Sequence, residues 1–189
     1  MVMAFRGRFG QAWRRLAGMR LLRDQRGTTA VEFGLLGVPF FLIIGAILER
    51  SLVFLSSQVL ESAVQDTSRL IRTGQSQGTM VSAQDFKDRV CSRLFGLYGD
   101  CSGLHVEVQT VNDFASTSIT PPIDPTCEID CAWSRPERFA PGTGSSIVVV
   151  QVYYKWPVLL SFGQASLANL PSGKRLLSTS TVFRNGPYG

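Results

Sequence analysis

Hydrophobic positions are distributed unevenly along this chain of 189 residues. Residues 33–48 form a run of sixteen uncharged, mostly apolar residues, and residues 28–31 extend it toward the N-terminus, interrupted only by Glu32. A membrane-spanning helix needs roughly 20 predominantly apolar residues, whereas a core helix of a soluble protein normally keeps a polar face. The pattern therefore predicts a transmembrane helix over residues 28–48.

Residues 49–73 show helical periodicity with a polar face, which predicts an amphipathic continuation of the same helix. Thr73 and Gly74 are expected to end it, because glycine commonly terminates helices. The apolar stripe of this segment is expected to consist of Leu52, Leu55, Val59, Ala63 and Leu70, widened by Val53, Leu60, Val64 and Ile71.

The pattern of residues 74–189 predicts a small exported α+β domain. Ser82 and Asp85 have the spacing of a capping box before a short helix. Alternating residues at 104–109 predict a half-buried strand, and the β-branched and aromatic residues 147–154 predict a stronger one. A weaker strand is expected at 177–183. We expect a small antiparallel sheet packed on the long helix, and a loop at residues 115–146, which are rich in proline, glycine, serine and threonine.

Positive charge is concentrated at the N-terminus. The formal net charge is +5, but residues 1–27 hold seven arginines and one aspartate, so the remaining chain is close to neutral. A nucleic-acid-binding domain would carry a basic face, and this distribution argues against a nucleic-acid partner. A basic segment directly before a membrane helix keeps the N-terminus cytoplasmic and places the rest of the chain on the opposite side.

Four cysteines, Cys91, Cys101, Cys127 and Cys131, follow the predicted membrane helix. An even number of cysteines on the exported side predicts two disulfides. A zinc site is the alternative, but the spacing lacks the paired C-x-x-C motifs of such sites, and we expect no metal and no other cofactor. Three connectivities are possible, and the short loops favour bonds Cys91–Cys101 and Cys127–Cys131.

Residues suited to catalysis are scarce. His105 is the single histidine, and we expect it to be solvated on the polar face of its strand. The sequence contains no P-loop, G-x-G-x-x-G or H-E-x-x-H motif. We therefore expect no catalytic residues and no enzymatic activity, and an exported hydrolase is a less favoured alternative.

The residues around Glu32 narrow the interpretation. A carboxylate in a membrane helix costs roughly 2.5–3.5 kcal/mol at the bilayer centre and suggests a function, although a glutamate can also reach the headgroups. The segment 25–36, QRGTTAVEFGLL, with Pro39 beyond it, resembles the N-terminal signature of TadE-like minor pilins, or pseudopilins, of tight-adherence pili. The ending 183–188, FRNGPY, is similar to the asparagine-acid-proline ending of that family, with Gly186 in the acidic position.

The resemblance implies that a prepilin peptidase removes the leader 1–27 by cleaving between Gly27 and Thr28. Glu32, which precedes Phe33, would then be the fifth residue of the mature chain. Its carboxylate could pair with the new ammonium group of a neighbouring subunit and set the register between helices. Close helix packing is expected at four small residues, Ala30, Gly34, Gly37 and Gly45.

The resemblance also implies partners and a location. The partners would be the prepilin peptidase, other minor and major pilins, an inner-membrane pilus assembly platform and membrane lipid. The protein would cross the bacterial inner membrane once, with its C-terminal domain in the periplasm or outside the cell, and would assist pilus assembly. An uncleaved, signal-anchored domain that binds a partner is the alternative, and the two differ in whether Thr28 is the mature N-terminus.

Overall fold

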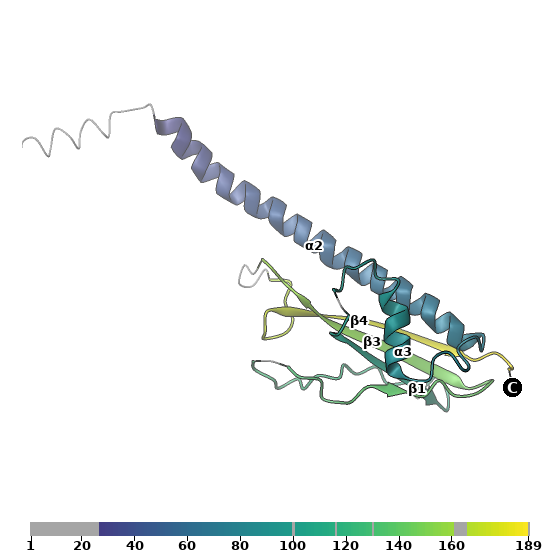
Figure 1. Ribbon diagram of the computed structural model, residues 1–189. Coiled ribbons are helices and arrows are strands. Elements are labelled where there is room, and N and C mark those ends of the chain that lie inside the picture. The colour runs from purple at the N-terminus through teal and green to yellow at the C-terminus, as the bar shows by residue number, and fades with distance from the viewer. Residues whose placement is uncertain (1–26, 100, 116, 130, 161–165, 189) are drawn as a thin grey trace, which may run out of the picture. The chain divides into compact units, whose positions relative to one another are not determined.

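The computed structural model describes residues 27–99, 101–115, 117–129, 131–160 and 166–188. The chain divides into two compact units, Met1–Gly45 and Ala46–Gly189. The predicted α+β class, with a long N-terminal helix and a small sheet, is confirmed. In chain order the elements are α2 (Thr28–Arg72), α3 (Ala83–Cys91), β1 (Leu104–Val111), β2 (Arg138–Phe139), β3 (Ile147–Pro157) and β4 (Lys174–Arg184) (Figure 1).

The sheet has the strand order β2-β1-β3-β4. The three predicted strands form its antiparallel part, in which Val150 of β3 lies opposite Val108 of β1 and Thr181 of β4. The fourth strand, β2, comes from the proline-rich loop and pairs parallel with β1. The sheet is therefore mixed rather than antiparallel throughout, and β2 was not predicted because a strand of two residues has no periodicity to detect.

Within the second unit, α2 packs on the sheet through a stripe of buried apolar residues. Val53, Leu60, Val64 and Ile71 belong to the same core cluster as Val106 of β1. Burying one such side chain contributes about 1.5–3 kcal/mol, so this face accounts for much of the packing energy of the helix. The predicted stripe was partly wrong, because Leu52 and Leu55 are half exposed on the sides of the helix that the sheet does not cover.

The short helix α3 begins with the predicted capping box. Ser82 Oγ accepts a hydrogen bond from Asp85 N, and Asp85 Oδ2 accepts one from Ser82 N at 2.9 Å. Phe86 and Val90 of this helix are fully buried in the core. At its end, Cys91 is bonded to Cys101, so a disulfide joins α3 to the turn that enters β1.

The proline-rich loop covers the second face of the sheet. His105, which was expected to be solvated, is only 2% exposed, and Glu107 on the same face is 5% exposed. The ring of Trp133 stacks on His105 with 4.6 Å between centroids, and the disulfide Cys127–Cys131 lies in the same loop. The prediction of a solvated histidine was wrong because the periodicity of a single strand does not reveal which distant segment covers it.

The C-terminal residues close the end of α2. Gly186 N donates to Arg72 O at 2.9 Å, and Tyr188 Oη donates to Ile71 O at 2.8 Å. These two carbonyls belong to the last turn of the helix, where no intrahelical donor is available. Gly74, at φ 73°, lies directly under the Tyr188 ring, and a Cβ there would approach that ring to 2.7 Å. The ending therefore acts as a cap supplied from a distant part of the chain.

Candidate functional site

The first half of α2 exposes its apolar side chains. Phe33, Leu36 and Phe41 are each more than 60% exposed, as are several of their neighbours. Among the described residues, α2 is the one helix long and apolar enough to cross a membrane, and its most apolar window of 18 residues is not buried at all. An apolar surface of this extent requires lipid or other helices to cover it.

One face of this helix is lined by small residues. At 3.6 residues per turn, Ala30, Gly34, Gly37 and Gly45 all fall within an arc of about 80°. A Cβ placed on Gly34 would meet no heavy atom within 4 Å, so a neighbouring backbone can approach there. A shallow apolar hollow of about 420 Å³ lies over the same face and is lined by Phe33, Gly34, Gly37, Val38, Phe41 and Leu42.

Glu32 lies on the opposite face. It is separated from Gly34 by about 200° around the helix axis, and it shares a face with Thr28, four residues earlier. Both Glu32 and Thr28 are exposed. The structure therefore separates Glu32 from the small residues, whereas Phe33 lies beside them, so one neighbour cannot contact both Glu32 and the small residues through the same face.

The predicted cleavage site adjoins the start of the helix. α2 begins at Thr28, and Gly27, which precedes it, is exposed. The rest of the basic leader, residues 1–26, lies outside the described part of the chain.

The four cysteines are joined as Cys91–Cys101 and Cys127–Cys131, which is the connectivity that the short loops favoured.

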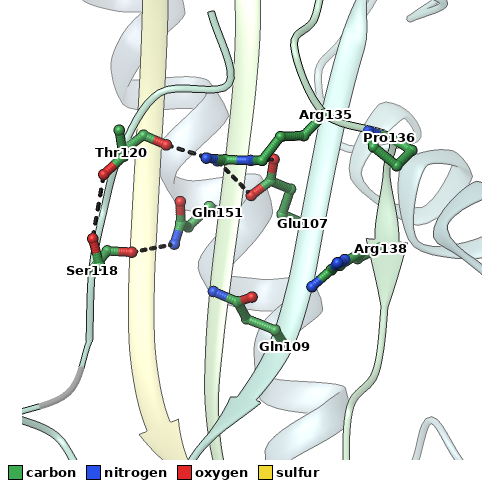
Figure 2. Close-up of a pocket in the computed structure, with 8 residues that line it drawn as sticks. All are labelled: Glu107, Gln109, Ser118, Thr120, Arg135, Pro136, Arg138 and Gln151. Carbon is green, nitrogen blue, oxygen red and sulfur yellow. Dashed lines mark hydrogen bonds and ion pairs between the residues drawn. The ribbon is translucent and has the colours of Figure 1, made fainter.

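A polar pocket of about 260 Å³ lies between the sheet and the loop that covers it (Figure 2). The Arg135 guanidinium donates to both carboxylate oxygens of Glu107, at 3.1 and 2.9 Å. Arg135 Nη2 also donates to Thr120 O at 2.8 Å, and Gln151 Nε2 donates to Ser118 O at 3.3 Å. These contacts fasten both arms of the loop to β1 and β3.

The buried aromatic and imidazole groups next to this pocket have structural partners. Burial and the negative charge of Glu107 raise the pKa of Tyr153 to about 12, so its phenol stays protonated and donates to Gln151 Oε1 at 2.6 Å. His105 Nε2 lies 3.2 Å from Glu107 Oε1, beneath Trp133. Within the described ranges, no three His, Cys, Asp or Glu side chains are grouped so that they could hold a metal ion.

Sequence reasoning missed two sets of residues. Glu107 and Arg135 are 28 residues apart, and no local spacing relates them. Asn185 is 3% exposed, and its Nδ2 donates to Pro141 O and Thr143 O at 2.9 and 3.0 Å. The resemblance of the chain ending was a usable signal for Asn185, but it gave no contact. Gly186 occupies the acidic position of that ending, where a Cβ would approach Arg72 O to 3.3 Å.

The comparisons with known proteins agree with the N-terminal signature. Residues 27–69 match the family model of TadE-like proteins. The match starts at the predicted cleavage site, includes Glu32 and the small residues, and ends three residues before the end of α2. No curated protein and no solved structure matches the chain. The resemblance inferred from the sequence is confirmed over residues 27–69, which are similar to TadE-like proteins.

Proposed function

We propose that this protein is a TadE-like minor pilin, or pseudopilin, that assists assembly of a tight-adherence pilus through its N-terminal helix. The observation that carries the proposal is the coincidence of two features. The segment that matches the TadE-like family contains the part of α2 whose apolar side chains are exposed. The folded unit has its own core, so these residues are left for contacts with lipid and other helices.

Processing would create the assembly-competent end of the helix. A prepilin peptidase would cleave between Gly27 and Thr28 and leave an ammonium group on Thr28. Pairing of this group with Glu32 of a neighbouring subunit would neutralise a carboxylate whose burial in the membrane is costly. Because Glu32 and Gly34 lie on opposite faces, each helix would contact one neighbour through its charged face and another through its small residues.

The proposed location follows from charge and disulfides. Seven arginines before the helix favour a cytoplasmic N-terminus, and the positive-inside rule then places residues 49–189 beyond the inner membrane. Two disulfides fit an oxidising compartment there. The partners would be the other minor and major pilins and the assembly platform, and the membrane helix would contact them.

The test is an intact-mass measurement on protein extracted from the membranes of cells that carry the cognate peptidase. The expected mass is that of a chain beginning at Thr28. Gly27→Phe should retain the leader, because a bulky residue replaces the small one at the cleaved bond, whereas Gly34→Ala should be processed normally. A wild-type chain that keeps residues 1–27 would contradict the proposal and favour the uncleaved, signal-anchored alternative.

The same preparation tests assembly. Glu32→Gln should be inserted and cleaved as in the wild type, but it should recover less of the other pilins on co-purification, because an amide cannot pair with an ammonium group as a carboxylate does. Normal recovery of the pilins would show that Glu32 has no part in assembly and only reaches the headgroups.

A further inference from the structure

Glu49 is a buried carboxylate in α2 that the proposed assembly does not use. It directly follows the predicted span 28–48 and is 9% exposed. Its carboxylate accepts hydrogen bonds from Leu159 N and from Leu160 N, the latter at 3.0 and 3.1 Å. All three residues belong to the unit Ala46–Gly189. Glu49 therefore holds the segment that leaves β3 against the helix.

The length of the predicted membrane span indicates the depth of Glu49 relative to the bilayer. Twenty-one helical residues, 28–48, extend about 31 Å at 1.5 Å per residue. The hydrocarbon core of a bilayer is roughly 30 Å thick. If the span begins at Thr28, Glu49 lies at the far boundary of the hydrocarbon core. Arg50, which is exposed, then falls at the level of the headgroups.

The segment that Glu49 holds is apolar, and Pro157 and Leu159 within it are exposed. Pro157–Leu160 reads PVLL, and Leu159 is 83% exposed. A single exposed leucine is ordinary on a protein surface. Here, however, the neighbouring turns of α2 in the same unit also expose large apolar side chains, namely Leu48, Leu52, Phe54 and Leu55.

The hydrogen bonds to Glu49 make such a segment compatible with an apolar environment. Backbone N–H groups that enter lipid must have partners within the protein, since each unsatisfied group costs several kcal/mol. Glu49 provides that acceptor for two successive N–H groups, and they in turn donate to a carboxylate that is largely removed from solvent. The two N–H groups and the carboxylate therefore satisfy one another, which removes most of the free-energy cost of burying either.

We propose that the segment Pro157–Leu160 is a second membrane contact, in which Glu49 fixes the backbone and Leu159 inserts into the interfacial region of the bilayer. The occupant is lipid, not a second protein, because Glu49, which holds the segment, directly follows the predicted span 28–48, and Leu48 and Leu52 beside Glu49 expose apolar side chains. This inference rests on the proposed membrane anchoring of α2. Its consequence is that the folded unit is held at the membrane surface while its helix packs with neighbours.

The test uses the full processed chain in vesicles of phosphatidylethanolamine and phosphatidylglycerol whose acyl chains are brominated near the headgroup end or near the methyl end. Bromine quenches tryptophan emission on contact. Leu159→Trp is compared with Ile129→Trp, at an 82% exposed position in the proline-rich loop of the same unit, and with Phe41→Trp within the span. The parent protein supplies the emission of the native tryptophans for subtraction.

The added emission of Leu159→Trp should be quenched by shallow bromines more than by deep ones, and that of Ile129→Trp by neither. Phe41→Trp should be quenched and reports the anchoring itself. Quenching of Phe41→Trp without quenching of Leu159→Trp would overturn the second contact while leaving the proposed anchoring intact. Absence of quenching at both positions would contradict the anchoring.

The role of Glu49 is tested in the Leu159→Trp background. Glu49→Ala removes the acceptor and should reduce the quenching by shallow bromines. Glu49→Gln keeps a side-chain carbonyl that accepts from an N–H, and it should preserve most of the quenching. Equal quenching in Glu49→Ala and in its parent would show that Glu49 does not hold the segment at the membrane.

Discussion

The two halves of α2 share the helical backbone conformation but differ in apolar content, and leucines such as Leu36 and Leu60 lie in opposite environments. Leu36 is 68% exposed, whereas Leu60 is 1% exposed. The second half is covered by the sheet of its own chain, and the first half is covered by nothing in the described structure. The backbone conformation alone does not distinguish them. The missing polar face of the first half does, because it indicates a helix whose solvent is not water.

The largest expected effect is on the free energy of unfolding, to which the two halves of α2 should contribute very differently. Leu60→Ala should lower the free energy of unfolding of the folded unit by about 2–5 kcal/mol, because it leaves a cavity in a core with no exposed route for relaxation. The matched substitution Leu36→Ala should change this free energy by less than about 0.5 kcal/mol. Urea unfolding in detergent, followed by near-ultraviolet circular dichroism with disulfides intact, measures both. Equal losses would mean that the two halves belong to one folded core.

The next expected effect concerns Asn185, which fastens the chain ending to the loop before β3. Asn185→Ala removes the two hydrogen bonds that the buried Asn185 amide donates to Pro141 O and Thr143 O and should cost about 1–3 kcal/mol. Asn112→Ala, at an exposed position just after β1, is the control and should be near neutral. The same urea titration compares them. Stability of the Asn185 variant equal to that of the Asn112 variant would show that the hydrogen bonds of Asn185 do not stabilise the folded unit.

The features that could be predicted from the sequence are those with a local cause. The capping box of Ser82 and Asp85 needs only a spacing of three, and the Cys91–Cys101 bond closes a loop of ten residues. The TadE-like signature is also confined to one helix. Each of these depends on residues that are close along the chain, where the possible geometries are few.

The features that were missed depend on contacts between distant residues. His105 is buried because Trp133 lies over it, and Tyr188 reaches Ile71 across 117 residues. No periodicity within a strand or a helix indicates which remote segment covers its polar side. A pairing such as that between Glu107 and Arg135 becomes visible only when the path of the loop is known.

The smallest expected effect is a dependence on pH at α3, a helix that is stabilised at its start by a side chain rather than by a distant segment. Hydrogen bonds from the Ser82 side chain and from Val81 N lower the pKa of Asp85 below its ordinary value of 3.8. A carboxylate with a lowered pKa in the folded state contributes stability above its unfolded pKa, and this contribution is lost as the pH falls through the folded pKa. Asp85→Asn should therefore be less stable than the wild type at neutral pH, and the difference should shrink once the pH drops below about 3.8.

Asp88→Asn, which removes a charge from the same helix outside the capping box, is the control, and urea titrations at several pH values compare the three proteins. A difference between wild type and Asp85→Asn that stays constant into the acid range would show that the cap does not depend on the charge of Asp85.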